Sequence, residues 1–545
     1  MNRLVLPLAL VLTMMSISDA TAQFTRQDTL RGSVTPERAW WDLIHYHLEI
    51  EVNPEDSTIY GKNTISYAVL EEHQTLQVDL QPPLVLSKAT QDGKTLEITS
   101  DGNAHFIHLD KPQHEGDHNK VVVHYGGRPH IAKRAPWDGG ITWTYDDNGH
   151  PFVANSCQGI GASIWWPCKD HMYDEPDSMM VSVTTPPELM DVSNGQLIKT
   201  ETRNDGKKTY HWKVINPINN YGVNISIGDY VHFGETYAGE AGPLQCDYYV
   251  LRDNLEKAKV QFSQVAGMMD AFEHWFGPYP FYEDGFKLIE VPYLGMEHQS
   301  AVTYGNGYQN GYRGTDLSSS GWGLKFDYII IHETGHEWFA NNITYKDIAD
   351  MWVHESFTTY SEALYVEYHY GKEAGAEYVR GMRTGINNDN PLIGTYGVNS
   401  RGPGDIYRKG SNILHTLRQV IDDDDLWRDI LRGLNETFYH ATVTSHQVEK
   451  YIADKANMDL TGFFEQYLRS PDVPILEYGY RNGRLGFKWS NVVSGFDMPI
   501  DVIIDGESRR LNATTRWKNI PLDSNPEDVH IDRDFYVAGI DIIGG

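Results

Sequence analysis

The spacing of apolar residues changes twice along the chain, and these changes constrain the fold more than any other feature of the sequence. Between about residues 40 and 250, short runs alternate between apolar and polar residues, as His45–Val52 does. A repeat of two places every second side chain on one face of a half-buried β-strand. From residue 326 to about residue 469 the pattern is helical, and after Ser470–Pro474 the alternation returns.

We therefore predict a multidomain α+β protein. An N-terminal antiparallel β-sandwich is expected over residues 23–250, a mainly α-helical domain over 251–470 and a small C-terminal β-sandwich over 471–545. The 545 residues match three or four domains of about 150 residues each. Hydrophobic residues make up 40% of the chain, which is enough apolar material for packed cores and excludes wholesale disorder.

A first helix is expected where the alternation stops. Asp253-Asn254-Leu255-Glu256 has the composition of a helix cap, and the apolar residues that follow it reach Phe276 at helical spacing. Gly277-Pro278 then predicts the end of this helix.

The first 22 residues have the pattern of a secretory signal peptide. Arg3 supplies a short positive start, Leu4–Met15 is apolar, and Ala20-Thr21-Ala22 offers small residues for cleavage. The apolar stretch is shorter than the about 20 residues that span a bilayer. We expect an exported protein, periplasmic or secreted and without stable membrane insertion; the alternative is a buried N-terminal strand.

The charge of the chain excludes one class of partner. Lys and Arg total 45 while Asp and Glu total 75, so the formal net charge is −30. A chain this acidic repels phosphate backbones and anionic lipids, and we therefore expect no nucleic-acid partner.

The three cysteines, Cys157, Cys168 and Cys246, are too few for a disulfide scaffold in a chain of this length. One pair is possible in an oxidising compartment, but the sequence does not fix a pairing. None of them lies in a Cys-x-x-Cys arrangement, so a cysteine metal site is not expected.

His332-Glu333-Thr334-Gly335-His336 is a His-Glu-x-x-His motif. On a helix, positions i and i+4 share a face, so both imidazoles can reach one metal ion. The glutamate between them then lies beside the ion, where it can take a proton from a bound water. The alternative is a pair of surface histidines on a helix.

Two glutamates downstream complete this pattern. Residues 337–354 separate His336 from Glu355, a gap of 18 that suits a second helix packed against the first and presenting a carboxylate to the ion. Glu362 lies two helical turns further along the same face, where it can orient a ligand. Its alternative is a solvated helix carboxylate.

His-Glu-x-x-His followed after 18 residues by glutamate resembles the signature of the gluzincin zinc aminopeptidases, peptidase family M1, of the aminopeptidase N type. Further segments are similar to family motifs and occur in the family's order. They are Cys157-Gln158-Gly159, Trp166–Asp170 with Asp174-Glu175-Pro176, Phe276–Phe281, Gly295-Met296-Glu297-His298, Tyr407-Arg408-Lys409-Gly410 and Phe463–Pro474. The resemblance runs from about residue 40 to 475 and implies a thermolysin-like catalytic domain over 251–470.

The resemblance also implies a mechanism for the metal-bound part of the site. His332, His336 and Glu355 would hold one zinc ion per chain, with water in the fourth position. Glu333 would act as general base, and Tyr407 would donate a hydrogen bond to the tetrahedral oxyanion.

A second group of residues would bind the substrate, a peptide with a free N-terminus. Glu297 and Gln158 would hold its α-amine, and this contact would restrict cleavage to one residue at a time. Gly295 would let the substrate backbone approach closely, beside Met296 of the same motif. Oligomeric state and residue preference stay open.

Some residues depart from the family pattern. His298 stands where the family usually has asparagine, and His354 and Ser356 flank the third ligand, Glu355, in place of the usual asparagine and glycine. The chain also ends without the long C-terminal helical domain of many relatives, which suggests a short three-domain form.

Three functions are weighed: an aminopeptidase, a related zinc hydrolase that acts on a lipid epoxide or as an endopeptidase, and a non-catalytic zinc-binding protein. No Gly-x-Ser-x-Gly or phosphate-binding loop is present.

Overall fold

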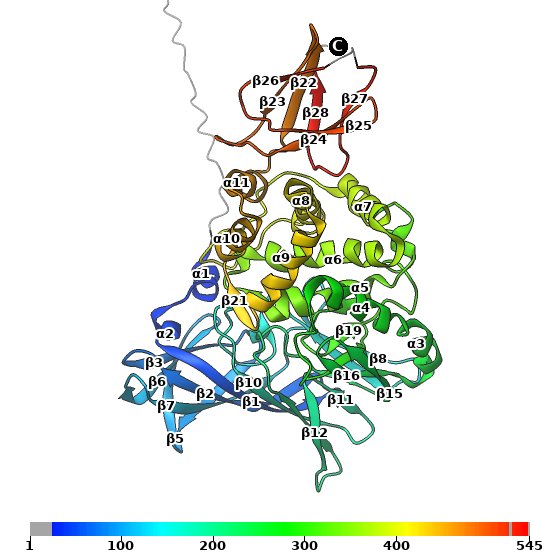
Figure 1. The fold of residues 1–545 in the computed structure, drawn as a ribbon. Coiled ribbons are helices and arrows are strands. Elements are labelled where there is room, and N and C mark those ends of the chain that lie inside the picture. The colour runs from blue at the N-terminus through cyan, green and yellow to red at the C-terminus, as the bar shows by residue number, and fades with distance from the viewer. Residues whose placement is uncertain (1–23, 523–525, 543–545) are drawn as a thin grey trace, which may run out of the picture.

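The computed structural model describes residues 24–522 and 526–542. In it, three layers follow one another along the chain. N-terminal strands form the base, helices form the middle and C-terminal strands form the far end (Figure 1). This arrangement confirms the predicted multidomain α+β fold, in which β-rich domains lie on either side of a helical one.

Two sheets make up the N-terminal β-rich domain. The larger has the strand order β12-β13-β10-β1-β2-β7-β4-β5-β6-β3 and the smaller β11-β14-β9-β8. The elements are α1 (Arg26–Gly32), α2 (Pro36–Ala39), β1 (Trp41–Asn53), β2 (Thr58–Val69), β3 (His73–Asp79), β4 (Val85–Gln91), β5 (Lys94–Asp101), β6 (Ala104–Gln113), β7 (His118–Gly127), β8 (Gly140–Tyr145), β9 (Pro151–Ser156), β10 (Ser178–Thr185), β11 (Met190–Val192), β12 (Gln196–Thr202), β13 (Lys208–Val214) and β14 (Ser226–Gly228).

Strand β1 shows how the alternation builds this domain. Tyr46, Leu48, Ile50 and Val52 are buried, and the residues between them are more exposed. The strand pairs antiparallel with β2 on one side and parallel with β10 on the other. Its buried face joins one continuous apolar core.

A five-stranded sheet crosses the boundary predicted at residue 250. Its order is β15-β16-β17-β19-β18, with bounds β15 (Tyr230–Gly239), β16 (Gly242–Leu251), β17 (Phe286–Glu290), β18 (Gly295–Met296) and β19 (Val302–Tyr304). Because β16 lies parallel to β17, residues 230–251 belong to the same sheet as residues 286–304. Alternation of apolar and polar residues is typical of strands in either domain. Only the pairing of β16 with β17 assigns β15 and β16 to this sheet. Strand β18 is an edge strand of this sheet.

The helices of the middle layer carry most of the candidate site. They are α3 (Leu255–Gln261), α4 (Gln264–Phe276), α5 (Tyr328–Gly335), α6 (Trp352–Tyr370), α7 (Lys372–Gly381), α8 (Asp405–Ile421), α9 (Asp424–Thr437), α10 (Ser445–Ala456) and α11 (Thr461–Arg469). Two short strands, β20 (Ile343–Tyr345) and β21 (Ala441–Val443), pair in parallel between them.

The first of these helices differs from its prediction at the N-terminus. A 3-10 turn over Arg252–Asn254 precedes α3, and Asn254 occupies the predicted cap position but makes no side-chain cap hydrogen bond. The helix is also interrupted between α3 and α4. Gly277 ends α4 as predicted, with a φ of 90° that favours glycine.

The C-terminal strands form two small sheets, with orders β26-β23-β22-β28 and β25-β24-β27. The bounds are β22 (Ile475–Arg481), β23 (Arg484–Ser490), β24 (Ile500–Ile504), β25 (Glu507–Leu511), β26 (Lys518–Pro521), β27 (Val529–Ile531) and β28 (Ala538–Asp541). Their core is continuous with that of the helical layer. The Tyr467 hydroxyl of α11 also donates to the Tyr536 carbonyl at 2.9 Å, so these strands are docked on the helices.

Other predictions concern membrane insertion, the signal peptide and the cysteines. In the described part of the chain, no helix is long and apolar enough to cross a membrane. The predicted signal peptide, and the buried strand that was its alternative, lie outside the described residues. Cys157, Cys168 and Cys246 are buried and carry free thiols.

Candidate metal centre and active site

The His-Glu-x-x-His motif lies on α5, and local interactions explain both ends of this helix. Asp327 caps the N-terminus, because its carboxylate accepts a hydrogen bond from the Ile329 amide at 3.1 Å. His336 caps the C-terminus, and the chain then leaves helical geometry within residues 337–342. This kink brings the Phe339 carbonyl within 3.1 Å of His336 Nδ1.

Each imidazole of the motif uses Nδ1 for a protein contact and leaves Nε2 for a ligand. His332 Nδ1 lies 2.6 Å from Glu362 Oε1, on α6. His336 Nδ1 lies 3.1 Å from the Phe339 carbonyl and 3.0 Å from Thr358 Oγ1. A proton held on Nδ1 by an oxygen acceptor leaves an unshared electron pair on Nε2. Both rings are therefore prepared to bind a metal ion, and Glu362 lies where the sequence predicted it.

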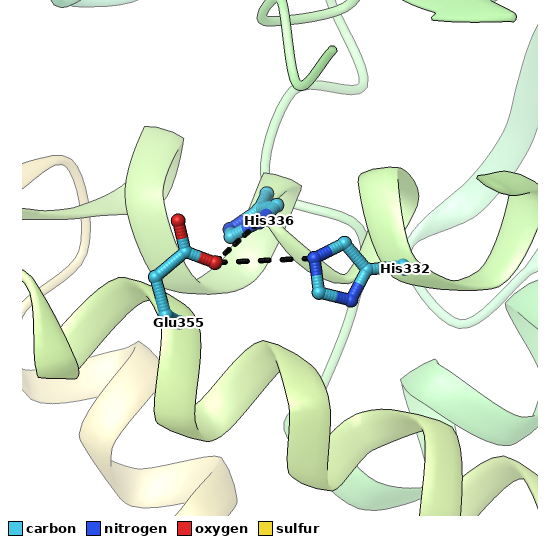
Figure 2. Close-up of side chains that lie close together, drawn as sticks. All are labelled: His332, His336 and Glu355. Atoms are coloured by element: carbon cyan, nitrogen blue, oxygen red, sulfur yellow. Dashed lines mark ion pairs between the residues drawn. The ribbon is translucent and has the colours of Figure 1, made fainter. Parts of the chain in front are cut away.

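Glu355, from the first turn of α6, completes a cluster of three ligand atoms (Figure 2). Its Oε2 atom lies 3.4 Å from His336 Nε2 and 3.9 Å from His332 Nε2. The metal-binding atoms of the three residues all lie within 4.8 Å of one another, and all three residues are buried.

The hydrogen bonding of Glu355 tests whether these residues fit a metal ion. Glu355 Oε1 accepts a hydrogen bond from Gln158 Nε2 at 2.9 Å, whereas Oε2 is buried without any hydrogen-bonding partner. A buried carboxylate oxygen without a partner is costly unless an ion satisfies it. Two imidazole nitrogens and one carboxylate oxygen are also the donor set of a catalytic zinc site with one open position. The residues therefore fit zinc.

Three buried glutamates near the cluster differ in their pKa values. Burial raises the pKa of Glu333 to about 7 and also raises that of Glu297. Burial opposes ionisation of Glu355 too, but the neighbouring His336 outweighs it and lowers the pKa of Glu355 to about 2. Environments that separate the pKa values of neighbouring acids assign them different roles. Glu355 is suited to ligation and Glu333 to proton transfer.

Glu297 is held beside the cluster by neutral hydrogen-bond donors. Its Oε1 atom accepts from Gln158 Nε2 at 2.7 Å and from the Tyr221 hydroxyl at 3.1 Å. Glu297, Glu333 and His336 bring their ligand atoms within 4.8 Å of one another. The predicted amine-binding residues thus lie together beside the metal cluster. Tyr221 had no sequence signal, because it belongs to no motif.

Tyr407 enters the site from α8. Its ring stacks near His332, with centroids 6.3 Å apart and planes at 26°. Burial raises the pKa of Tyr407 well above its usual value, so the hydroxyl keeps its proton and remains a hydrogen-bond donor.

Gly295 lies on β18, and its missing side chain leaves room for α5. A Cβ atom there would lie 2.6 Å from Ile329 Cγ2 and 3.3 Å from Glu333 Cγ. The close approach observed is therefore between β18 and the helix that carries the motif. The approach of substrate backbone stays a prediction. Met296, the next residue, lines the cleft.

These groups surround one cleft of about 210 Å³. Its lining brings together every predicted metal, catalytic and substrate residue, while Glu362 lies behind it. Trp137, which is 60% exposed, and Arg401 also line the cleft. Neither has a sequence signal, since both come from irregular loops.

The three departures from the family pattern are all buried, and none lines the cleft. Burial lowers the pKa of His298 to about 3, which keeps this ring neutral. His354 Nε2 accepts from the Tyr345 amide at 2.9 Å, and Ser356 donates to the Ile406 carbonyl at 2.7 Å. These side chains therefore pack around the centre and do not line its surface.

Two family models match the chain. The peptidase M1 N-terminal domain matches residues 43–221, and the peptidase family M1 domain matches residues 260–467. Together the two matches cover more than half of the 545 residues.

Several known proteins are similar over most of the chain. Endoplasmic reticulum aminopeptidase 1 of Mus musculus is 23% identical over 80% of this chain and 49% of its own length. Leukotriene A-4 hydrolase of Xenopus laevis is 20% identical over 82% of this chain and 74% of its own length. The chain spans about half the length of the aminopeptidase relative.

A solved structure with the same fold is an M1 zinc metallopeptidase mutant from Deinococcus radiodurans bound to a Tyr-Ser-Ala substrate. It is 20% identical and superposes with a TM-score of 0.68 over 79% of this chain and 95% of its own. Motifs, fold and family models agree, and the chain belongs to peptidase family M1.

Proposed function

We propose that this protein is a zinc-dependent aminopeptidase that removes residues one at a time from the free N-terminus of peptides. One observation carries the proposal: Glu355 Oε2 makes no hydrogen bond and faces the Nε2 atoms of His332 and His336, with the Glu297 carboxylate beside the same cluster. The ligand atoms of Glu297 and His336 lie within 4.8 Å of each other, so the amine site adjoins the metal site, as an exopeptidase requires. The aminopeptidase relatives support the same function.

His332, His336 and Glu355 would hold the zinc ion, and three protein ligands leave one position open for chemistry. When bound, zinc polarises the scissile carbonyl and lowers the pKa of a water molecule. The chain's contribution here is orientation: Glu362 and the Phe339 carbonyl hold the two rings before the substrate arrives.

Glu333 and Tyr407 move and hold protons during the reaction. Glu333 accepts the proton of the attacking water and then passes it to the leaving amine. Its carboxylate is buried and lies within 4.8 Å of the ligand atoms of His336 and Glu297, so both transfers take place beside the metal cluster. Tyr407 donates its hydroxyl hydrogen to the developing oxyanion, a contact usually worth about 3–4 kcal/mol.

Glu297 and Gln158 would fix the free α-amine. A carboxylate and an ammonium form strong charge-assisted hydrogen bonds in a buried site. Gln158 Nε2 joins Glu297 to Glu355, so the amine site is tied to the metal ligand at a fixed distance. The edge strand β18 offers backbone groups for a peptide to pair with as an added strand.

Turnover of aminoacyl p-nitroanilides tests the proposal directly. We expect hydrolysis that a chelator abolishes and zinc restores, with one zinc ion per chain. Glu333→Gln should retain zinc and lose about 10²- to 10⁴-fold in kcat. Zinc binding without turnover of any aminoacyl substrate would instead favour a non-catalytic zinc-binding protein.

N-terminally acetylated peptides separate aminopeptidase activity from other zinc hydrolase activities. An acetylated amine carries no positive charge, so Glu297 would gain nothing from binding it. We expect cleavage of free peptides alone. Equal cleavage of both would favour an endopeptidase, and turnover restricted to a lipid epoxide would favour that alternative.

We further propose export to the periplasm or the medium, on the pattern of residues 1–22. N-terminal sequencing of the mature protein from cell fractions tests this. A mature chain beginning near residue 23 outside the cytoplasm is expected, and a cytoplasmic chain beginning at Met1 would contradict it.

A further inference from the structure

Arg401 is the one lysine or arginine among the described residues that line the cleft. The same cleft carries three carboxylates, those of Glu297, Glu333 and Glu355. Each carboxylate has a place in the proposed function. The guanidinium of Arg401 does not yet have one.

The Arg401 side chain is exposed, and its guanidinium has no ion-pair or hydrogen-bonding partner within residues 24–522 and 526–542. The chain has 75 acidic residues against 45 basic ones, so carboxylate partners are abundant. Arg401 is nevertheless left unpaired at the cleft. An arginine there can bind a planar anion through two hydrogen bonds.

The loop that carries Arg401 is anchored to the rest of the protein on its N-terminal side. The Gly394 amide donates to the Ala349 carbonyl at 2.9 Å, and the Gly397 amide donates to Asp347 Oδ2 at 2.9 Å. Further along, the Asn399 amide donates to an α1 carbonyl at 3.1 Å. A tethered backbone loses little entropy on binding, so Arg401 is presented to the cleft rather than free to swing away.

Arg401 lies on the Tyr407 side of the metal cluster. Its charge acts on the Tyr407 hydroxyl. Tyr407 stacks near His332, whereas Glu297 groups with the other imidazole, His336. A peptide with its amine at Glu297 and its scissile carbonyl at the metal therefore extends toward Arg401 with its leaving portion.

We propose that Arg401 binds a carboxylate of the substrate on the leaving side of the scissile bond, so that the enzyme prefers peptides with negative charge directly after that bond. This inference rests on the proposed aminopeptidase function. The carboxylate has two sources: the C-terminus of a dipeptide, or an acidic side chain in the second residue of a longer peptide. Either would give Arg401, the one lysine or arginine among the described residues of the lining, a charge partner of opposite sign.

Two pairs of peptides distinguish the sources. A dipeptide and its C-terminal amide differ only in the terminal carboxylate. Two amidated dipeptides with Glu or Gln as second residue differ only in the side-chain carboxylate. An aminoacyl p-nitroanilide has no carboxylate on its leaving side and reports the proposed function separately. All are compared by kcat/KM at low salt, with the same first residue.

We expect wild-type enzyme to prefer the charged member of at least one pair, and Arg401→Gln to reduce that preference by about 10- to 100-fold, mainly through KM. Arg401→Lys should restore part of the preference, because it keeps the charge but loses the planar fork. Arg134→Gln is the matched control, since Arg134 is an exposed arginine outside the cleft lining. It should leave the preference within about two-fold.

Active enzyme without a preference in either pair would overturn the inference and leave the aminopeptidase function standing. The inference would also be overturned if Arg401→Gln kept the preference for the charged peptide, or if Arg134→Gln reduced that preference as much as Arg401→Gln does. Failure to hydrolyse any substrate, the anilides included, would reject the function and the inference together.

Discussion

Glu362 holds the ring of His332 from behind. Its Oε1 atom lies 2.6 Å from His332 Nδ1, and its Oε2 atom accepts a hydrogen bond from the Tyr378 hydroxyl at 2.5 Å. The first contact turns His332 Nε2 toward Glu355, and the second holds the carboxylate in place. Glu362 therefore prepares the metal site without lining the cleft.

Glu362→Gln is predicted to weaken zinc binding by about ten-fold or more. The neutral amide makes His332 a weaker electron-pair donor to the metal and removes a negative charge that balances the charge of the ion. Substitutions of residues that hydrogen-bond to metal ligands usually cost 10- to 100-fold in metal affinity. Competition with a chelator of known affinity measures the change. Tyr378→Phe should have a smaller effect in the same direction. Glu373→Gln, an exposed carboxylate on α7, is the control, and equal zinc affinity in all variants would contradict the role of Glu362.

Gly295→Ala is predicted to reduce both activity and stability. Its Cβ atom would lie 2.6 Å from Ile329 Cγ2 and 3.3 Å from Glu333 Cγ, so either β18 or Ile329 has to move, and a shift of α5 would carry Glu333 with it. A shift of about 1 Å at a catalytic group can cost about 100-fold in rate. Gly404→Ala is the matched control, because nothing lies within 4 Å of a Cβ there. Similar kcat/KM values and thermal midpoints for both variants would show that β18 tolerates the side chain.

The metal cluster was predictable because its signal is local. A helical repeat places His332 and His336 on one face, and a spacing typical of the family added Glu355. The helical repeat then placed Glu362 two turns beyond Glu355 on the same face. The order of the other motifs brought Glu297, Gln158 and Tyr407 to the cleft as well. Each of these residues carries its signal in its own neighbourhood of the sequence.

The residues that sequence reasoning missed depend on tertiary packing. Trp137 and Arg401 reach the cleft from irregular segments, and Tyr221 reaches Glu297 from another. No periodicity reports where a loop is anchored. The same reason explains the strands at residues 230–251, whose alternation suits either domain until β16 pairs with β17. It also explains Gly295, whose nearest neighbours lie on α5 and β19 and not in its own motif.

Glu297→Gln is predicted to lower kcat/KM for free peptides by about 10- to 100-fold. The amide keeps the shape of the carboxylate but loses the charge that would bind the α-ammonium, and charged hydrogen bonds contribute about 1.5–3 kcal/mol. Steady-state rates on matched free and acetylated peptides measure this. Discrimination between the two should shrink in the variant. Tyr221→Phe, which removes only one neutral donor to Glu297, should reduce the rate less. Unchanged discrimination in Glu297→Gln would place the amine elsewhere.

The last prediction concerns Glu337 and the stability of the fold, not catalysis. This residue follows His336 and is fully buried, where it accepts hydrogen bonds from the Tyr279 hydroxyl at 2.9 Å and the Ser300 amide at 3.0 Å. Burial raises the pKa of Glu337 to about 8, above its ordinary value of 4.5. The folded state therefore binds this proton more tightly than the unfolded state does.

The sign of the pH dependence follows from that difference. Between about pH 4.5 and 8, folding takes up a proton at Glu337, so the free energy of unfolding falls as pH rises through this window. From pH 5.5 to 8.5 this residue should account for a fall of about 3 kcal/mol. Glu337→Gln has no proton to lose, so its unfolding free energy should fall less between the two pH values. Urea unfolding of both proteins at both pH values gives the double difference, in which other titrating groups cancel. A double difference near zero would mean that Glu337 is ionised in the folded protein at neutral pH.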